Sequence, residues 1–342
     1  IYETVSSFRY ETSHTRPLIR DREITVWHEI HTAHESQEEA EAEVKKHEEF
    51  YDKIWEFLGL PVIKVKKPQW EVFPGAVGAV EYYSLMPTGR VMENGSLNNL
   101  GQAYAKKFNI KFKNEKGKED YVWQICTGNG ARLLAAVIAV HGDDQGLVMP
   151  PNIAPVQAVI IPIYPKKGKD KVVKECEKVK LDLEKEGLRV HLDLRDEFPG
   201  SKFYDWEIKG VPLRVEIGPR DIDNKQVTVV RRDTKKKELV SRTELGKLKP
   251  LLDQIQKDLL GRAQEQLDTH TKIASTKKEL GEKVKGGNLV KVGWCGSDGC
   301  WDEVKDIVEG VELFGTALEG KKGTCVICGK VSTEIGYVAR TY

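Results

Sequence analysis

The sequence predicts an α+β protein with two or three domains, and three observations support this. The chain has 342 residues, and one domain usually takes about 100 to 200 residues. Hydrophobic residues make up 39% of the chain, which supplies folded cores and excludes a wholly disordered protein. Strand and helix patterns alternate along the chain, and four of its six cysteines lie near the C-terminus. We expect domains at 1–151, 152–268 and 269–342.

The charge balance argues against a protein that coats nucleic acid through a global positive field. Lys and Arg number 54, Asp and Glu 53, and the net charge is +1, so only local basic patches remain for such contacts. No run of 18 apolar residues occurs, so we expect no membrane partner. The first residues, IYETVSSFRY, lack an initial Met and are neither a signal peptide nor an anchor. We expect that an N-terminal part precedes them.

A hairpin and two helices organise the first block. Its strands are expected at 4–10 and 18–26, around a polar loop. A helix begins at Ser36, where the pattern S-x-x-E predicts a capping box, and ends at Gly59. An apolar helix is expected at 131–140, buried on most sides. The core face of the first helix is predicted as Ala40, Val44, His47, Tyr51, Ile54 and Leu58. Further strands are expected at 61–66, 78–85, 89–93, 108–113 and 120–126.

The second block predicts a small, mostly parallel sheet with helices on its faces. Residues 156–164 form a continuous apolar run, as a buried parallel strand does. A helix capped by Asp170 and ended by Gly187 follows, and the block continues in a βαβαββ order. Residues 242–285 are expected to be helical. The core face of the helix is predicted as Val172, Cys176, Val179 and Leu183.

The third block carries the strongest local motif, a set of closely spaced cysteines. The patterns C-x4-C and C-x2-C form two short loops that can bring four thiolates to one tetrahedral Zn²⁺. Such a four-cysteine site is closed and therefore structural, and it suits a reducing compartment, here the cytoplasm. The predicted ligands are Cys295, Cys300, Cys325 and Cys328. The remaining two, Cys126 and Cys176, lie in apolar patterns and are predicted to be core residues.

Two motifs in the first block indicate a site for a polyphosphate. Arg9 and Arg20, on neighbouring predicted strands, can clamp phosphates, and Glu11 can accept from the amino group of a purine. Thr127-Gly128-Asn129-Gly130-Ala131 precedes Arg132, which opens an apolar helix. Glycines let a backbone approach a ligand, and a semi-buried arginine needs an anion such as a triphosphate. An ordinary hairpin with surface ion pairs is the alternative for the first motif.

Together these motifs resemble the second and third signature motifs of class II aminoacyl-tRNA synthetases. Longer segments, in collinear order, are similar to prolyl-tRNA synthetases of the archaeal and eukaryotic type: FRYETSHTRPLIRDREIT, EIHTAHESQEEAEAEV, GSLNNLGQAYAKKFNIKF, AVIAVHGDDQGLVMPP, KFYDWEIKGVPLRVEIGPRD and the terminal ARTY. The resemblance implies a class II antiparallel-sheet catalytic domain at 1–151. An α/β anticodon-binding domain at 152–268 and a small zinc-binding α+β domain at 269–342 follow.

The resemblance also implies roles for particular residues. Arg9 would hold the α-phosphate region and Arg132 the γ-phosphate end, and both are predicted to be catalytic. Asn98 and Arg9 are predicted to bind the amino acid. The predicted ATP-binding residues are Arg9, Glu11, Arg20, Asp21, Glu93, Ser96 and Arg132. The predicted tRNA contacts are Lys202, Arg214, Arg220 and Asp221. The implied cofactors are ATP, Mg²⁺ and structural Zn²⁺, and the implied partners are proline, tRNA(Pro) and a second copy of the chain.

The chain departs from the family pattern around the amino-acid pocket. Glu93 stands where the family usually has Gln, Ser96 replaces Thr, and Asn98 replaces His. At Thr127 and Gly130 the usual aromatic residue and hydroxyl are missing. The family's T-x-E motif and first class II motif would lie before Ile1. His31 and His34 could be metal ligands or a base, although the resemblance implies that they line or support the pocket.

Three functions fit these observations. The first is ATP-dependent ligation of proline to tRNA(Pro) through an aminoacyl-adenylate. The second is the same chemistry with another small amino acid, which the altered pocket residues suggest. The third is a non-catalytic, tRNA-binding or regulatory relative. Amino-acid-dependent pyrophosphate exchange separates the three.

Overall fold

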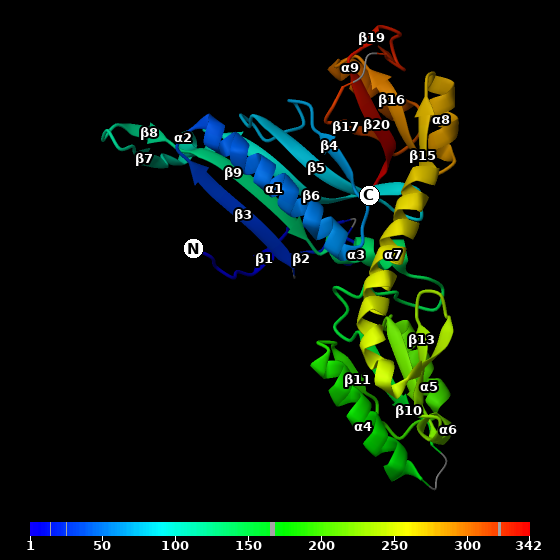
Figure 1. Cartoon of the computed structure of the whole chain (residues 1–342). Coiled ribbons are helices and arrows are strands. Elements are labelled where there is room, and N and C mark those ends of the chain that lie inside the picture. The colour runs from blue at the N-terminus through cyan, green and yellow to red at the C-terminus, as the bar shows by residue number, and fades with distance from the viewer. Residues whose placement is uncertain (14, 25, 165–167, 321–322) are drawn as a thin grey trace. The chain divides into compact units, whose positions relative to one another are not determined.

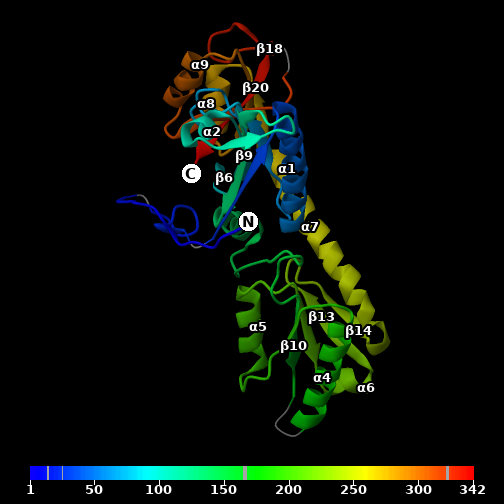
Figure 2. The same cartoon turned by 90° about the vertical axis from the view of Figure 1, so that its left-hand side faces the viewer.

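The computed structural model describes residues 1–13, 15–24, 26–164, 168–320 and 323–342. The chain forms two compact units, shown in Figures 1 and 2. The first unit comprises 1–56, 60–136 and 265–342, and the second comprises 57–59 and 137–264. The N-terminal and C-terminal segments thus belong to one unit, whereas the domain boundaries predicted from the sequence separate them.

A long, mixed sheet forms the centre of the first unit. Its strand order is β15-β16-β20-β17-β4-β5-β6-β9-β3. Adjacent strands from β4 to β3 are antiparallel. The C-terminal strands join through Thr316 of β17, paired with Lys66 of β4, and through a parallel pairing of β20 with β6. The bounds are β3 Trp27–His34, β4 Ile63–Lys66, β5 Gly78–Leu85, β6 Arg90–Gly101, β9 Trp123–Gly130, β15 Thr271–Ala274, β16 Leu289–Trp294, β17 Val311–Thr316 and β20 Glu334–Thr341.

Helix α1, Gln37–Leu58, covers one face of this sheet (Figure 1). The capping box is confirmed in part: Ser36 Oγ accepts from the backbone N–H of Glu39, whose carboxylate accepts from Glu35 N–H. The predicted core face lacked Trp55, which is 2% exposed. Its ring stacks on Tyr51 with centroids 5.6 Å apart, and Tyr51 stacks on Tyr82 of β5 at 4.9 Å. The buried face of the helix therefore includes Trp55, whereas the predicted neighbour Ile54 is only partly buried.

The remaining elements of the first unit are short. The expected hairpin is shorter than predicted, because only β1 Ser7–Phe8 and β2 Glu23–Ile24 pair; residue 25 of the predicted strand lies outside the described residues. The expected pair at 108–113 and 120–126 is β7 Lys111–Lys113 with β8 Glu119–Tyr121. The helices are α2 Ala103–Phe108, α8 Lys277–Lys285, α9 Asp298–Glu303 and the 3-10 turn η2 Val304–Asp306. The two-residue strands β18 Gly323–Thr324 and β19 Val331–Ser332 pair near the C-terminus.

Helix α3, Arg132–His141, contradicts one expectation about burial. It was predicted to be buried on most sides, yet Leu134 is 43% exposed and only Ala135, Ala136 and Val137 are fully buried. The helix runs from the first unit into the second. Its apolar composition therefore does not reflect a deep core position.

The second unit has the parallel α/β arrangement that its pattern predicts. The sheet order is β11-β10-β12-β13-β14, with β11, β10 and β12 parallel and the others antiparallel. The predicted face of α4 is confirmed, since all four of its residues are buried; its N-cap is Gly168, and Asp170 lies in the first turn. The strands are β10 Ala158–Pro162, β11 Val190–Leu192, β12 Leu213–Ile217, β13 Gln226–Arg231 and β14 Lys237–Ser241. The helices are α4 Lys169–Lys185, α5 Pro199–Ile208, α6 Pro219–Asp223 and the 3-10 helix η1 Arg242–Lys247.

Helix α7, Leu248–His270, continues from η1. It buries Leu248, Leu252, Ile255 and Leu259 in the core of the second unit, at the spacing of one helix face. The prediction that 242–285 is entirely helical is wrong, because β15 follows α7 and pairs in parallel with β16. Among the described residues, none of the helices is both long and apolar enough to cross a membrane.

Candidate active site and metal centre

One open pocket of about 400 Å³ lies in the first unit, beside the N-terminal hairpin and the strands β6 and β9. The hairpin loop, β3, β6, β9 and the start of α3 all contribute to its wall. The pocket wall contains seven residues predicted from the sequence to bind ATP or the amino acid: Arg9, Arg20, Asp21, Glu93, Ser96, Asn98 and Arg132. Glu11 is not part of the wall. The structure thus brings together motifs that lie more than 100 residues apart in the chain.

Arg132 holds a central position because it is the first residue of α3. Its Nε donates to the carbonyl oxygen of Ile19 at 2.9 Å, and its Nη1 lies 3.2 Å from Glu93 Oε2. The sequence showed no carboxylate near Arg132 along its own helix. The structure supplies one from β6, so the guanidinium is paired even without a bound anion.

The hairpin loop arranges the other arginines. Arg20 pairs with Glu11 at 2.7 Å. Asp21 accepts from the backbone N–H of Leu18 at 3.1 and 3.2 Å. Leu18 has a φ of 63°, which is unfavourable for a branched side chain, so the Asp21 carboxylate helps to stabilise this turn. Asp21 therefore has a structural role in addition to its place in the pocket wall.

The strands β6 and β9 form the floor of the pocket. Asn98 Nδ2 donates to Ser96 Oγ at 3.2 Å, because residues two apart on a strand share a face. Trp27 and Phe73 both line the pocket and supply aromatic surface to it. At Gly130 a Cβ would come within 3.1 Å of the carbonyl oxygen of Val26. A side chain at this position would require the neighbouring backbone to shift slightly.

The sequence indicates His31 as a possible metal ligand or base, but sequence reasoning missed its two polar neighbours on the pocket wall, Glu29 and Cys126. Cys126 was predicted to be a core residue, and it is 8% exposed, but it also lines the pocket. Its Sγ donates to Glu29 Oε1 at 3.2 Å, and His31 Nε2 lies 3.1 Å from the same oxygen. The alternation of Glu29 and His31 along one strand was the available signal for this polar group. That Cys126 lies opposite them is shown only by the pairing of β3 with β9.

Electrostatics couple these three groups. Burial raises the pKa of Glu29, but hydrogen bonds from Trp27, Cys126 and His31 outweigh it and leave the pKa below its usual value. Burial, together with the Glu29 carboxylate, raises the pKa of Cys126 to about 12. In the metal-free protein the cysteine is therefore a thiol at neutral pH, and Glu29 is a carboxylate.

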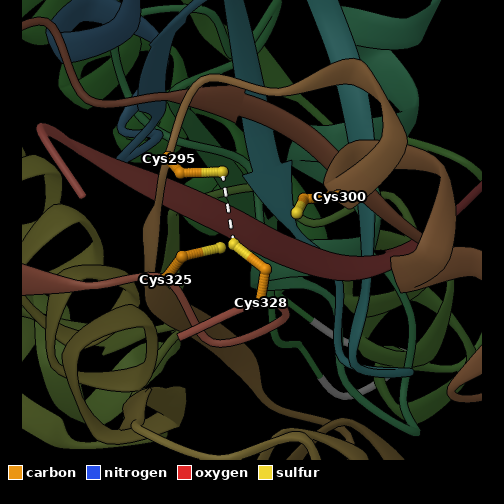
Figure 3. A group of neighbouring side chains, drawn as sticks. All are labelled: Cys295, Cys300, Cys325 and Cys328. Atoms are coloured by element: carbon orange, nitrogen blue, oxygen red, sulfur yellow. Dashed lines mark hydrogen bonds between the residues drawn. The ribbon is translucent and has the colours of Figure 1, made fainter. Parts of the chain in front are cut away.

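The four predicted cysteine ligands gather at one end of the first unit (Figure 3). All four sulfurs lie within 4.8 Å of one another, and the Sγ atoms of Cys295 and Cys328 are 3.7 Å apart. A tetrahedral Zn²⁺ with Zn–S bonds of about 2.3 Å places its sulfurs about 3.8 Å apart. A hydrogen bond from the backbone of Lys330 lowers the pKa of Cys328 to about 7, so one thiolate is available at neutral pH. The donor set fits a closed, structural metal site.

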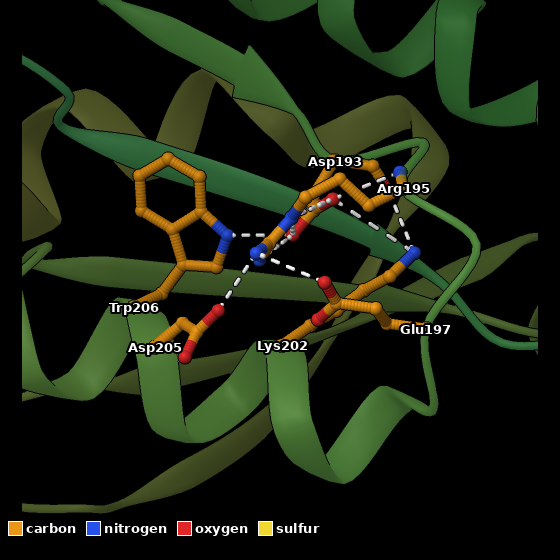
Figure 4. Close-up of polar contacts among 6 residues, drawn as sticks. All are labelled: Asp193, Arg195, Glu197, Lys202, Asp205 and Trp206. Atoms are coloured by element: carbon orange, nitrogen blue, oxygen red, sulfur yellow. Dashed lines mark hydrogen bonds and ion pairs between the residues drawn. The ribbon is translucent and has the colours of Figure 1, made fainter.

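The predicted tRNA contacts in the second unit differ in their exposure. Lys202 is 2% exposed, and its Nζ donates to the carbonyl oxygen of Asp193 at 3.1 Å (Figure 4). Asp193 is also buried and accepts from Arg195 and from Trp206 Nε1. Burial raises the pKa of Asp193, but these hydrogen bonds outweigh it and lower the pKa well below its usual range. The prediction for Lys202 is therefore corrected: its ammonium stabilises the interior.

The other three predicted contacts lie at or near the surface. Arg220 is exposed, in the short helix α6. Asp221 accepts from the backbone N–H of Gly218 at 2.8 Å and so caps that helix. Arg214 on β12 is engaged by Glu207 at 2.7 Å and Glu216 at 3.0 Å. Among these three, only the guanidinium of Arg220 is exposed to solvent.

Comparison with family models divides the chain into three matched segments. Residues 1–141 match the tRNA synthetase class II core domain (G, H, P, S and T). Residues 157–248 match the anticodon binding domain, and residues 277–342 match the prolyl-tRNA synthetase C-terminal domain.

Similarity to whole proteins decides the family. The chain is 42% identical over 347 residues to the proline–tRNA ligase of Methanobrevibacter smithii, covering all of this chain and 73% of that protein. It is 44% identical over 355 residues to the proline–tRNA ligase of Pyrococcus horikoshii, with the same coverage. The chain belongs to the prolyl-tRNA synthetase family. The resemblance that the motifs indicated, and the fold class expected from it, are confirmed.

A solved structure agrees with this family membership. The prolyl-tRNA synthetase of Cryptosporidium parvum, in a crystal structure complexed with L-proline and AMP, superposes with a TM-score of 0.92. It is 34% identical in sequence, and the match covers 99% of this chain and 74% of that one. This member of the family therefore shares the fold of a synthetase across almost its whole length.

Proposed function

We propose that this chain ligates proline to tRNA(Pro) in two ATP-dependent steps. In the first step a carboxylate oxygen of proline attacks the α-phosphorus of ATP, which forms prolyl-adenylate and releases pyrophosphate. In the second step the 3′-terminal ribose hydroxyl of the tRNA attacks the carbonyl carbon of the adenylate, and AMP leaves. Neither step requires a protein nucleophile, so the protein acts by positioning the reactants and neutralising phosphate charge.

The observation that carries the proposal is the convergence of Arg9, Arg20 and Arg132 on one pocket. Three guanidiniums in one cavity suit a triphosphate, whose oxygens accept charge-assisted hydrogen bonds. Arg9 holds the α-phosphate region, where the attack occurs, and Arg132 holds the γ-phosphate end. Glu11, which orients Arg20, and Asp21, which stabilises the loop, keep the arginines in place.

Magnesium is proposed to enter with ATP. When bound, it neutralises charge on the phosphate oxygens. Asp21 supplies carboxylate oxygens in the pocket wall, the ligand type that Mg²⁺ prefers.

The amino acid is proposed to bind beside Asn98 and Arg9. Asn98 is 6% exposed and is oriented by Ser96. Trp27 and Phe73 supply apolar surface to the same pocket, which suits the ring of proline. Because Asn98 and Gly130 depart from the family pattern within this pocket, a second candidate function is activation of another small amino acid by the same chemistry.

The C-terminal cysteines are proposed to hold one structural Zn²⁺. The closely packed sulfurs of Cys295, Cys300, Cys325 and Cys328 support this assignment. Four thiolates close the coordination sphere, so the ion stabilises the fold around α9 and the β18–β19 turn. Such thiol-rich sites persist in a reducing environment, and we propose a cytoplasmic location on this ground.

The second unit is proposed to bind the anticodon stem-loop, with 152–268 as an anticodon-binding domain. Arg220 is the proposed contact to phosphate or to a base edge, since it is exposed. Asp221, which caps α6 beside Arg220, is proposed to orient this surface. Arg214 lies near the opposite end of β12 and is proposed as a separate contact. Single-stranded bases are the part of an RNA that such a surface can read. The full protein is proposed to work as a homodimer.

The test of this function is amino-acid-dependent exchange of pyrophosphate into ATP, measured on the full-length protein. Exchange that depends on proline, followed by transfer of proline to tRNA(Pro), is the expected result. Exchange with a different amino acid would favour the second candidate. Absence of exchange with every amino acid would contradict both and leave a non-catalytic relative.

A further inference from the structure

The strand pairing brings three side chains of metal-binding type together beside the pocket, and two of them, Glu29 and Cys126, line it. His31 on β3 pairs directly with Cys126 on β9. Glu29 lies two residues before His31 and therefore shares its face of the strand. The ligand atoms of the three residues lie within 4.8 Å of one another. They come from two adjacent strands of a sheet, so their relative positions are set by backbone hydrogen bonds.

The distances correspond to three edges of a tetrahedron around one ion. Zn²⁺ binds sulfur at about 2.3 Å and nitrogen or oxygen at about 2.0 to 2.2 Å, which places tetrahedral ligands about 3.4 to 3.6 Å apart. The observed separations are 3.1 Å from His31 Nε2 to Glu29 Oε1, 3.2 Å from Cys126 Sγ to that oxygen, and 3.8 Å from Sγ to Nε2. Small side-chain movements accommodate an ion between them.

A neighbouring side chain fixes the orientation of the carboxylate. Trp27 Nε1 donates to Glu29 Oε2 at 2.9 Å, which leaves Oε1 directed at His31 and Cys126. Such outer hydrogen bonds orient metal ligands in protein sites. A combination of thiolate, imidazole and carboxylate favours Zn²⁺ over Mg²⁺ or Ca²⁺, which prefer oxygen ligands.

We propose that Glu29, His31 and Cys126 form a second metal site, which binds Zn²⁺ with three protein ligands and one open position. Glu29 and Cys126 both line the pocket, so the open position faces it. A nitrogen or carboxylate oxygen of the amino-acid substrate is the fourth ligand. That last assignment rests on the proposed function, whereas the metal site itself does not.

The binding step is balanced by proton release. Zn²⁺ displaces the thiol proton of Cys126, which passes to solvent, and His31 coordinates through Nε2 as the neutral ring. The hydrogen bonds that Glu29 Oε1 accepts are then replaced by its bond to the ion. Since His31 and Glu29 are partly exposed, the ion can enter from the pocket.

Zinc stoichiometry of the full-length protein tests the site. We compare the wild type with His31→Gln and Cys126→Ser, after loading with Zn²⁺ and removal of unbound ion. Each variant is expected to bind one equivalent of Zn²⁺ less than the wild type. Zinc bound by the four C-terminal cysteines should be the same in all variants and so does not affect this difference. The control is His28→Gln, a histidine on the opposite face of β3, which should leave the count unchanged. Equal zinc in the wild type and in His31→Gln overturns the proposal, provided that circular dichroism shows both folded.

Cobalt substitution tests the fourth ligand. Co²⁺ bound to a thiolate absorbs visibly, and the difference spectrum between the wild type and Cys126→Ser isolates the pocket ion from the C-terminal site. Addition of L-proline is expected to shift this difference spectrum, because a new donor replaces water. If addition of L-proline leaves the difference spectrum unchanged in a protein that still catalyses proline-dependent exchange, the proposal that proline is the fourth ligand is overturned. Loss of exchange with an intact zinc count instead contradicts the proposed function alone.

Discussion

Glu93 and Arg132 form an ion pair inside the pocket, with Oε2 and Nη1 3.2 Å apart although the residues are 39 positions apart in the chain. Glu93 stands where the family usually has a neutral Gln. Its carboxylate therefore forms an ion pair with the guanidinium that is proposed to hold the γ-phosphate end of ATP. Binding of the nucleotide must weaken or share this contact.

Replacement of Glu93 by Gln should strengthen ATP binding. The variant frees Arg132 from a competing carboxylate and removes repulsion between Glu93 and the phosphates. Because the pair is partly exposed, we expect a modest gain of about 1 kcal/mol, or about a fivefold lower KM for ATP in pyrophosphate exchange. Glu115→Gln, in the exposed β7–β8 turn, is the matched control. A KM that stays the same or rises would show that Glu93 assists the nucleotide, for instance through Mg²⁺.

Replacement of Arg9 or Arg132 by Ala should slow adenylate formation. Each change removes a charge-assisted contact to phosphate that is strongest in the transition state. We expect a cost of about 3 kcal/mol, or roughly a hundredfold in the exchange rate. Arg22→Ala provides a control, since this exposed arginine of the same hairpin does not line the pocket. Losses no larger than those of the control would rule out the proposed phosphate contacts.

Removal of zinc should loosen the C-terminal part of the first unit. Metal-binding energy contributes to folding where the ligands are brought together only in the native state. We expect Cys300→Ser, or treatment with a chelator, to lower the thermal midpoint and to expose residues 295–330 to protease. Cleavage within the second unit should not increase. Unchanged protease resistance in a protein shown to be zinc-free would exclude a structural ion at this site.

The pH dependence of stability should reflect His141. Burial, opposed only in part by a hydrogen bond to the carbonyl oxygen of Gly59, lowers the pKa of His141 from 6.5 to about 4. The unfolded chain therefore binds a proton at higher pH than the folded chain does. The stability contributed by neutral His141 is present above pH 6.5 and is lost as the pH falls toward 4, by up to about 3 kcal/mol.

The variant His141→Gln keeps a donor for Gly59 but cannot titrate. Its thermal midpoint should fall less than that of the wild type between pH 6.5 and 4. His28→Gln, at an exposed position, should follow the wild type. Parallel curves for the wild type and His141→Gln would show that His141 does not cause the pH dependence.

Substitutions at Lys202 and Arg220 should have different effects, because the first should change stability and the second should change tRNA binding. Lys202→Met removes the buried ammonium beside Asp193 and should lower the free energy of unfolding by about 2 kcal/mol. Arg220→Ala should leave stability unchanged and raise the KM for tRNA without affecting pyrophosphate exchange. If Arg220→Ala leaves tRNA kinetics unaltered, the proposed RNA surface must lie elsewhere on the second unit.

Local patterns in the sequence determined the elements and the chemistry-bearing motifs. The four buried positions of α4 follow from helical spacing, and the apolar run of β10 follows from its burial between two parallel neighbours. Close spacing within the chain also indicated the C-terminal cysteine cluster, because two short loops limit where their sulfurs can lie. The convergence of Arg9 with Arg132 was expected from the family resemblance, which links distant motifs.

Only the tertiary structure decided which distant side chains meet. The pairing of Glu93 with Arg132, the burial of Lys202 against Asp193, and the position of Cys126 opposite His31 all depend on neighbouring strands and helices. Periodicity shows which face of an element is apolar, but it contains no information about the partner that covers a polar residue. For the same reason the sequence shows the C-terminal segment as a block of its own, and only the backbone pairing of β20 with β6 shows that this segment shares a sheet with the N-terminal block. The predicted domain boundaries stay a prediction.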